Sequence, residues 1–154
     1  MSFTGRPTTY LETVIENNGF FPDLSLGDFQ KMYGIPAEVI QEKAEHLLRV
    51  SIIDVNDSLL DQQNAWQAAG HVTLEAVPAQ QIGGKSRLLI QYQRAAFALA
   101  TAMAFRQYAT VTRREIGEHK VAESLDTEQM YRAESNRALR NLRGIDTNIT
   151  AELI

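Results

Sequence analysis

The chain has 154 residues, a formal net charge of −4 and no cysteine. This length suits one domain with a hydrophobic core. The acidic balance argues against attraction of the whole protein to nucleic acid, and the lack of cysteine excludes disulfides and thiolate metal sites. No apolar run approaches the length of a membrane span and no signal-peptide pattern opens the chain, so we expect a soluble protein that is made in the cytosol and contacts no membrane.

Charge is distributed unevenly along the chain. Residues 1–66 carry ten acidic and four basic side chains, whereas residues 106–143 carry eight basic and six acidic ones. An acidic front and a basic back could meet head to tail between copies of the chain. Taken singly, each charge is better explained as part of a solvated helix face.

Residues 1–24 are predicted to form an N-terminal arm. Residues 9–15 can pair as an extended segment, and Asn17-Asn18-Gly19 is a turn signal. Two adjacent aromatic residues follow, Phe20 and Phe21, and both need an apolar environment. We therefore expect the end of the arm to be held against the body of the protein.

Two helices are predicted after the arm. Ser25 and Asp28 resemble a capping box, which predicts a short helix that Gly34 ends. A long helix is expected from Pro36 to Ala69, because apolar residues keep one face at helical spacing. We expect a bend near Asp54–Ser58, since Asn, Asp and Ser compete for backbone hydrogen bonds.

A short finger is predicted next. Residues 71–77 alternate in hydrophobicity, which predicts a brief strand, and residues 78–85 are predicted to form a loop. Loops held by rigid helices often carry binding. The candidate contact residues of this finger are His71, Val72, Leu74, Pro78, Gln80 and Ile82.

The organising stretch of the chain is Ser86–Gly117, which is predicted to be one long helix capped by Ser86. Its middle, residues 95–105, is apolar nearly all round, so most sides should be buried and we expect another subunit to bury part of it. Small residues recur every seven positions and would let a second backbone come close. These candidates for contact between subunits are Ala95, Ala102 and Ala109.

The last helix is predicted from Thr127 to Arg143, after a connector over residues 117–123. It carries a band of arginines that could face DNA phosphates, pair with a neighbour's acids or solubilise the helix: Arg132, Arg137, Arg140 and Arg143.

Residues 145–154 form a polar tail with an apolar end. In an extended strand, alternation would place three of its apolar residues on one side, so we expect this tail to dock on a surface, either of a partner or of its own subunit. The candidate docking residues are Ile149, Ala151, Leu153 and Ile154.

One motif suggests nucleotide binding. Gly83-Gly84-Lys85-Ser86 follows a strand-like run and opens a helix, as a phosphate-binding loop does. The full pattern needs glycine where Ala79 stands, and no later strand offers an acidic residue for Mg²⁺. The motif therefore lacks the context that would support it.

Other polar groups also fall short of a catalytic site. Glu42 and His46 are four residues apart on one helix face, but two ligands do not make a metal site. Asp54, Asp57 and Asp61 share a face with polar flanks, which favours a solvated surface or a contact with basic groups of a neighbour over acid–base chemistry. We predict that the protein is not an enzyme and binds no metal or cofactor.

Several short strings occur in an order that resembles one protein family. They are Phe21-Pro22-Asp23, Val55-Asn56 with Leu59, Trp66, Gly70, Thr73-Leu74, Tyr92-x-Arg94-Ala95-Ala96 with Ala100, and Glu152-Leu153-Ile154. Over residues 15–154 the chain resembles the head completion/stabilisation proteins (GpL family) of peduovirus-type contractile-tailed phages. It departs from the family pattern at residues 32–36, where the family is usually richer in Arg and Thr.

The resemblance implies a structural role in the virion neck, between head and tail, with assembly in the host cytoplasm. Family members join the filled capsid at the portal vertex after DNA packaging. They resemble adaptor proteins that form a ring of about twelve subunits under the portal. The ring extends the DNA channel, helps to retain DNA and offers a platform for the next component.

Combined with the residues, the resemblance predicts an all-α fold: a small helical bundle with two long central helices, the finger between them, and extended N- and C-terminal arms. The expected division is an arm over 1–24, a helical adaptor domain over 25–144 and a docking tail over 145–154. The tail would contact the portal protein and the finger the next neck or tail-completion protein. Further copies of the chain would form the ring, and packaged DNA would make only non-specific contacts.

Two other functions stay open at this point. A small helical DNA-binding or regulatory protein would need an exposed basic recognition helix and would show salt-dependent affinity for DNA. A nucleotide-binding protein that uses Gly84-Lys85-Ser86 would be stabilised against heat by Mg-nucleotide.

Overall fold

A computed structural model describes residues 11–35, 39–112 and 118–144, with the side chains of 108–112 and 118–125 left undescribed. The fold is all-α, as predicted. Its helices are α1 (Leu26–Tyr33), α2 (Gln41–Ser58), α3 (Leu60–Ala68), α4 (Arg87–Thr112) and α5 (Glu118–Leu142). Two short antiparallel strand pairs join β1 (Val14–Ile15) to β2 (Leu24–Ser25), and β3 (Gln81–Ile82) to β4 (Lys85–Ser86).

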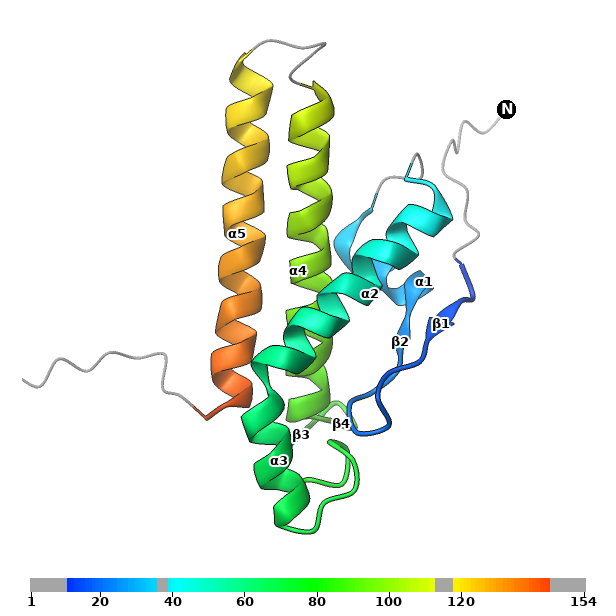
Figure 1. Cartoon of the computed structure of the whole chain (residues 1–154), viewed down its shortest axis with the longest axis vertical. Helices are drawn as coiled ribbons and strands as arrows, with labels where there is room; N and C mark the ends of the chain where they lie inside the picture. The colour runs from blue at the N-terminus through cyan, green and yellow to red at the C-terminus, as the bar shows by residue number, and fades with distance from the viewer. Residues whose placement is uncertain (1–10, 36–38, 113–117, 145–154) are drawn as a thin grey trace, which may run out of the picture.

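The long helix α4 lies at the centre of the molecule. Figure 1 shows α5 alongside it, running in the opposite direction, and α2 crossing it on the other side together with α1 and the first strand pair. Helix α3 follows the end of α2 and lies, together with the β3–β4 hairpin, at the end of the molecule where α4 begins. The two long helices at the centre are therefore α4 and α5, whereas the finger was predicted to lie between the two long helices and instead lies between α3 and α4.

The predicted helix caps are confirmed. The Ser25 hydroxyl accepts a hydrogen bond from the Asp28 backbone N–H at 3.2 Å, and α1 ends at Gly34, whose φ of 59° is left-handed. The Ser86 hydroxyl likewise accepts from the Leu88 N–H at 3.2 Å, at the start of α4. These side chains satisfy backbone donors that the first helical turn leaves without partners.

The long helix predicted over 36–69 is divided into α2 and α3. The break falls at Leu59, just after the bend that was expected, and Pro36 lies outside the described residues. Hydrogen bonds continue across the break, because the Leu59 N–H donates to the carbonyl oxygens of Val55 and Asn56 at 3.1 Å each. Leu59 is fully buried, so the change of direction turns an apolar side chain into the core.

The strand predicted over 71–77 is wrong. This segment consists of turns in which Ala76 N–H donates to Thr73 O and Val77 N–H donates to Leu74 O, both at 3.1 Å. Leu74 and Val77 are its buried side chains, and their spacing of three fits turns rather than a strand. The strands lie instead in the segment predicted as a loop, as the β3–β4 hairpin.

The β3–β4 hairpin depends on two glycines. Gly83 and Gly84 have φ values of 59° and 80°, as a tight two-residue hairpin turn requires. Side chains other than glycine rarely adopt this backbone conformation. The pair therefore has a structural explanation that does not involve phosphate.

The prediction that the last helix begins at Thr127 is also wrong. Helix α5 begins at Glu118, so it includes most of the predicted connector. Residues 118–126 contain no glycine or proline and are rich in good helix formers, so nothing local ends the helix there. Ala138, Leu139 and Leu142 of α5 are buried.

The apolar middle of α4 is covered by its own chain. On one side, the Ser135 hydroxyl of α5 donates to the Ala95 carbonyl at 2.8 Å, and the Tyr131 ring of α5 stacks on Phe105 at 5.9 Å. On the other side, Phe97 packs against Phe29 of α1 at 5.2 Å. The cover that we expected from another subunit is therefore provided largely by α1, α2 and α5.

The small-residue stripe lies in the contact between α4 and α5. Ala95 and Ala102 are fully buried, and they share a helix face with Phe105, which meets α5. We expected the backbone of a second helix to pack closely against this stripe, and α5 of the same chain is that helix. Ala95 and Ala102 thus have no exposed surface for a second subunit, and the side chain of Ala109 lies outside the described residues.

We expect Ala102→Leu to lower the free energy of unfolding by about 1–3 kcal/mol, because a buried alanine facing a packed helix leaves no room for three further carbon atoms. Chemical denaturation measures this. Ala65→Leu, on an exposed position of α3, is the matched control and should change stability little. Equal stability of both variants would show that the α4–α5 contact is loose.

Candidate interaction surfaces

A closed polar network fixes the end of the N-terminal arm. The Asn17 amide donates to the Tyr92 hydroxyl at 2.8 Å, this hydroxyl donates to Asn56 Oδ1 at 2.5 Å, and the Asn56 amide donates back to Asn17 Oδ1 at 2.9 Å. The three residues come from the arm, α4 and α2. Burial raises the pKa of Tyr92 well above its ordinary value, so the phenol remains protonated and can donate.

Aromatic rings extend this attachment. Phe21 stacks on Tyr92 with ring centroids 4.7 Å apart, and Phe20 lies nearly parallel to Trp66 of α3 at 6.1 Å. Phe20 and Phe21 are both 3% exposed. The prediction that these aromatics hold the end of the arm against the body is confirmed.

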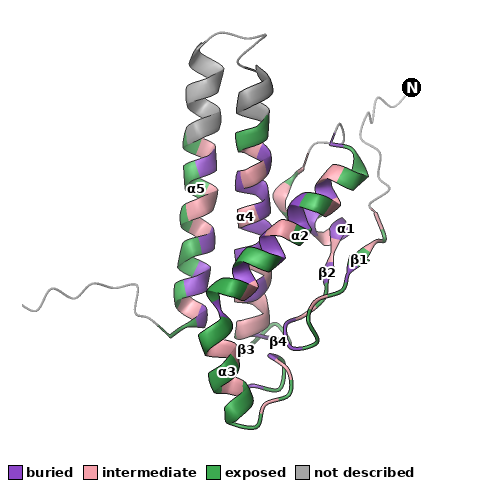
Figure 2. Ribbon diagram, viewed as in Figure 1, coloured by how far each residue is buried: buried purple, intermediate pink, exposed green. Residues whose placement is uncertain are grey.

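The arm in turn positions the segment after α3. The Leu74 N–H donates to the Phe20 carbonyl at 2.9 Å, and Leu74 is fully buried. We call α3 together with residues 69–84 the tip. Its nine-residue helix has no buried residue, so α3 projects from the bundle rather than belonging to the core (Figure 2).

The six predicted finger residues differ in accessibility. Val72 is 79% exposed and Ile82 is 51% exposed, so both could meet a partner. Pro78 and Gln80 are also exposed, and His71 is half-buried. Leu74 is buried, so it positions the tip and cannot itself contact another protein.

The hairpin does not form a phosphate-binding loop. Its strands are antiparallel, and the Ser86 hydroxyl is engaged as the helix cap. An open cavity of about 440 Å³ beside Lys85 is also lined by Asp23 and Glu75, whose carboxylates disfavour an anion. The nucleotide-binding alternative thus loses the geometry on which it depended.

The four predicted arginines, three on α5 and Arg143 directly after it, differ in whether their guanidinium groups have a partner. Arg132 pairs with Glu128, one turn away, at 2.9 Å. The Arg143 guanidinium donates to the Ser58 carbonyl at the end of α2, where a cation suits the helix dipole. Arg137 and Arg140 are exposed and make no hydrogen bond or ion pair within the described part of the chain.

Within that part, no three His, Asp or Glu side chains lie close enough together to hold a metal ion. Glu42 and His46 are exposed on α2, as are Asp54 and Asp57 further along. None of the described helices is long and apolar enough to span a membrane. The four tail candidates, Ile149 to Ile154, lie outside the described residues.

Comparison with known proteins identifies the family. Residues 15–154 match the phage head completion protein (GPL) family. The chain belongs to this family. It is 29% identical over 142 residues to a probable head completion/stabilization protein of Haemophilus phage HP1, an alignment that covers 92% of this chain and 93% of the relative.

A second relative supports the same assignment. The head completion/stabilization protein of Escherichia phage P2 is 30% identical over 116 residues, which cover 75% of this chain and 68% of that protein. No solved structure gives a significant match. The chain is thus a member of a family of structural virion proteins that act in completing phage heads.

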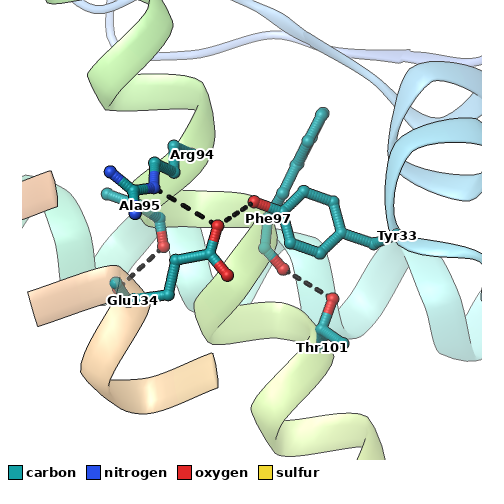
Figure 3. A network of polar contacts seen from close by, with 7 residues as sticks. Tyr33, Arg94, Ala95, Phe97, Thr101 and Glu134 are labelled. Carbon is teal, nitrogen blue, oxygen red and sulfur yellow. Dashed lines mark hydrogen bonds and ion pairs between the residues drawn. The ribbon is translucent and has the colours of Figure 1, made fainter. Parts of the chain in front are cut away.

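The string Tyr92-x-Arg94-Ala95 in this family member marks contacts between helices. Arg94 pairs with Glu134 of α5 at 3.3 Å, and the same carboxylate oxygen accepts from the Tyr33 hydroxyl at 3.1 Å (Figure 3). Together these residues tie α1, α4 and α5. Burial and the nearby Glu134 carboxylate raise the pKa of Tyr33, which keeps this phenol protonated as well. Periodicity did not reveal this network, because its residues are far apart in sequence.

We expect Tyr92→Phe to lower the free energy of unfolding by about 1–3 kcal/mol, since it leaves Asn56 Oδ1 without its donor. Denaturation followed by fluorescence of Trp66 would also report loosening of the tip. Tyr131→Phe is the control, because the described residues provide no hydrogen bond to that hydroxyl. A Tyr92→Phe protein as stable as wild type would mean that water replaces the network at no cost.

Proposed function

We propose that this protein completes filled phage heads as a non-catalytic neck adaptor. In this proposal, copies form a ring under the portal after packaging, extend the DNA channel and provide a platform for the next neck or tail component. Membership of the head completion family is the observation that supports the proposal most strongly. The closed helical core supports it too, because the described part of the chain offers surfaces for contact rather than a catalytic cleft.

We further propose how the surfaces are divided between partners. The tip projects from the bundle and carries exposed apolar side chains at Val72 and Ile82. It is a suitable contact for the next neck protein. The apolar residues of the tail, which follows Gly144 at the end of α5, are proposed to bind the portal. The unengaged arginines of α5 are left for a neighbouring subunit or the DNA in the channel.

The tip is tested by replacing Val72 and Ile82 with aspartate. Both side chains are exposed, so the double variant should fold normally and still join heads, but these heads should fail to acquire the next component. Composition of purified heads by mass spectrometry gives the result. Val14→Asp, at a 55% exposed position in β1, is the matched control. If heads that carry the double variant joined tails normally, the tip would not be the contact for the next neck protein.

The tail is tested by deleting residues 148–154. The contacts of α4 with α1 and α5 join residues within 11–144, so the truncated protein should remain folded and soluble but should no longer join heads. Burial of two or three such side chains at a partner is worth about 3–6 kcal/mol per copy before the cost of ordering. A full-length variant with Ile149, Leu153 and Ile154 replaced by serine separates loss of apolar contact from loss of length.

Two outcomes would count against the portal contact. A truncated protein that unfolds would show that the tail folds back onto its own subunit. A truncated protein that still completes heads would show that the portal is bound elsewhere.

A further inference from the structure

The junction of α2 and α3 exposes an apolar and acidic face. Ile53 is 57% exposed and Leu60 is 53% exposed, and Asp57 lies between them in sequence. Ile53 and Asp57 are four residues apart and therefore on one side of α2, and Leu60 opens α3 directly after the break at Leu59, so these exposed side chains lie next to the junction. Asp61 adds a further exposed carboxylate. We call these residues the acidic face.

Helix α5 exposes a face of opposite charge. Met130 is 56% exposed, and Ala133, Arg137 and Arg140 are also exposed. Their spacings of three, four and three residues place all four on one side of α5. We call them the basic face. Figure 2 shows exposed residues along the outer side of α5 and, separately, along α2 and α3.

We propose that the basic face of one copy docks on the acidic face of a second copy. This inference rests on the ring in the proposed function and names the surfaces that would close it. The acidic face has two large exposed apolar side chains and two carboxylates, whereas the basic face has Met130, Ala133 and two guanidinium groups, so the faces are complementary in charge. Because the two faces are different surfaces of the chain, the contact between copies is heterologous. Such contacts close into a ring when the rotation between copies permits.

Single exposed apolar residues are common and need no partner. Here, however, the nearby charges point to the occupant. The Asp57 and Asp61 carboxylates make no hydrogen bond or ion pair among the described residues, and the same holds for Arg137 and Arg140. Arg143 lies close to the acidic face, but its guanidinium is held at the Ser58 carbonyl.

A second copy explains the basic face better than DNA does. Only two unengaged arginines lie on it, because Arg132 and Arg143 are engaged within the chain. The exposed Met130 at one end of the face has no role against phosphate. The whole chain is also acidic, with a net charge of −4. Binding to DNA through phosphates depends on several such cations together.

The test is a charge exchange measured by sedimentation of the full chain over a range of concentrations at low salt. Arg137→Glu with Arg140→Glu, or Asp57→Lys with Asp61→Lys, should each weaken self-association about tenfold or more. A chain that carries all four substitutions should recover association to within about threefold of wild type, because opposite charges again face each other. Glu12→Lys with Glu16→Lys, on exposed positions of the arm, controls for the change in net charge.

The contact would be overturned if the wild-type chain remained monomeric at all concentrations tested. It would also be overturned if the quadruple variant associated no better than the two double variants. Head completion by the same variants separates this inference from the proposed function. If the wild type completes heads and both paired variants do so equally well, the contact is wrong while the function stands. If Arg137→Glu with Arg140→Glu heads assemble but lose DNA, the basic face meets the DNA channel instead.

Discussion

The structure depends on the enclosure of α4 by the rest of its own chain. The middle of this helix has small side chains toward α5 and the large ring of Phe97 toward α1. Alanines let the backbone of α5 approach closely, and the Ser135 hydroxyl then reaches the Ala95 carbonyl. An apolar helix of this kind is stable in water only when it is covered on most sides. Because one chain supplies that cover, other surfaces remain for assembly.

Two polar networks then fix how the remaining elements sit on α4. Tyr92 joins the arm and α2 to one side of the helix, and Arg94 joins α1 and α5 through Glu134. Partly satisfied groups in such places would be costly, so a closed network favours one arrangement over its alternatives. The arm holds the tip through Phe20, which stacks on Trp66 and accepts from the Leu74 N–H. Surfaces far from the core are thus positioned by contacts that begin at α4.

Much of the fold could be predicted from the sequence because its signals are local. Ser25, Gly34 and Ser86 mark helix ends through their own hydrogen bonds or backbone angles, and the long apolar run identifies α4. The start of α5 was missed, because a run of ordinary helix formers such as residues 118–126 carries no boundary signal. The segment 71–77 differs from the predicted strand, because three or four alternating residues fit both a strand and a series of turns.

The candidate surfaces were harder to predict, since exposure depends on tertiary packing. Ala95 and Ala102 were expected to face another subunit, and nothing local shows that α5 covers them. Leu74 is among the predicted contact residues of the finger, although its side chain is buried and its N–H donates to the Phe20 carbonyl. Among the arginines, only the structure distinguishes Arg143, held at the end of α2, from Arg137 and Arg140. The family resemblance came from the order of short strings, and comparison with known proteins confirms it.

The most direct test of the account is the native mass of the purified protein, measured at low concentration alone and after mixing with purified portal. A core closed within one chain and a role at the portal together predict that the chain is folded even as a monomer at low concentration, and that it forms a complex with several copies on each portal assembly. A chain that is unfolded until it meets other copies would contradict the closed core. A folded chain that never appears in complex with the portal would contradict the proposed role.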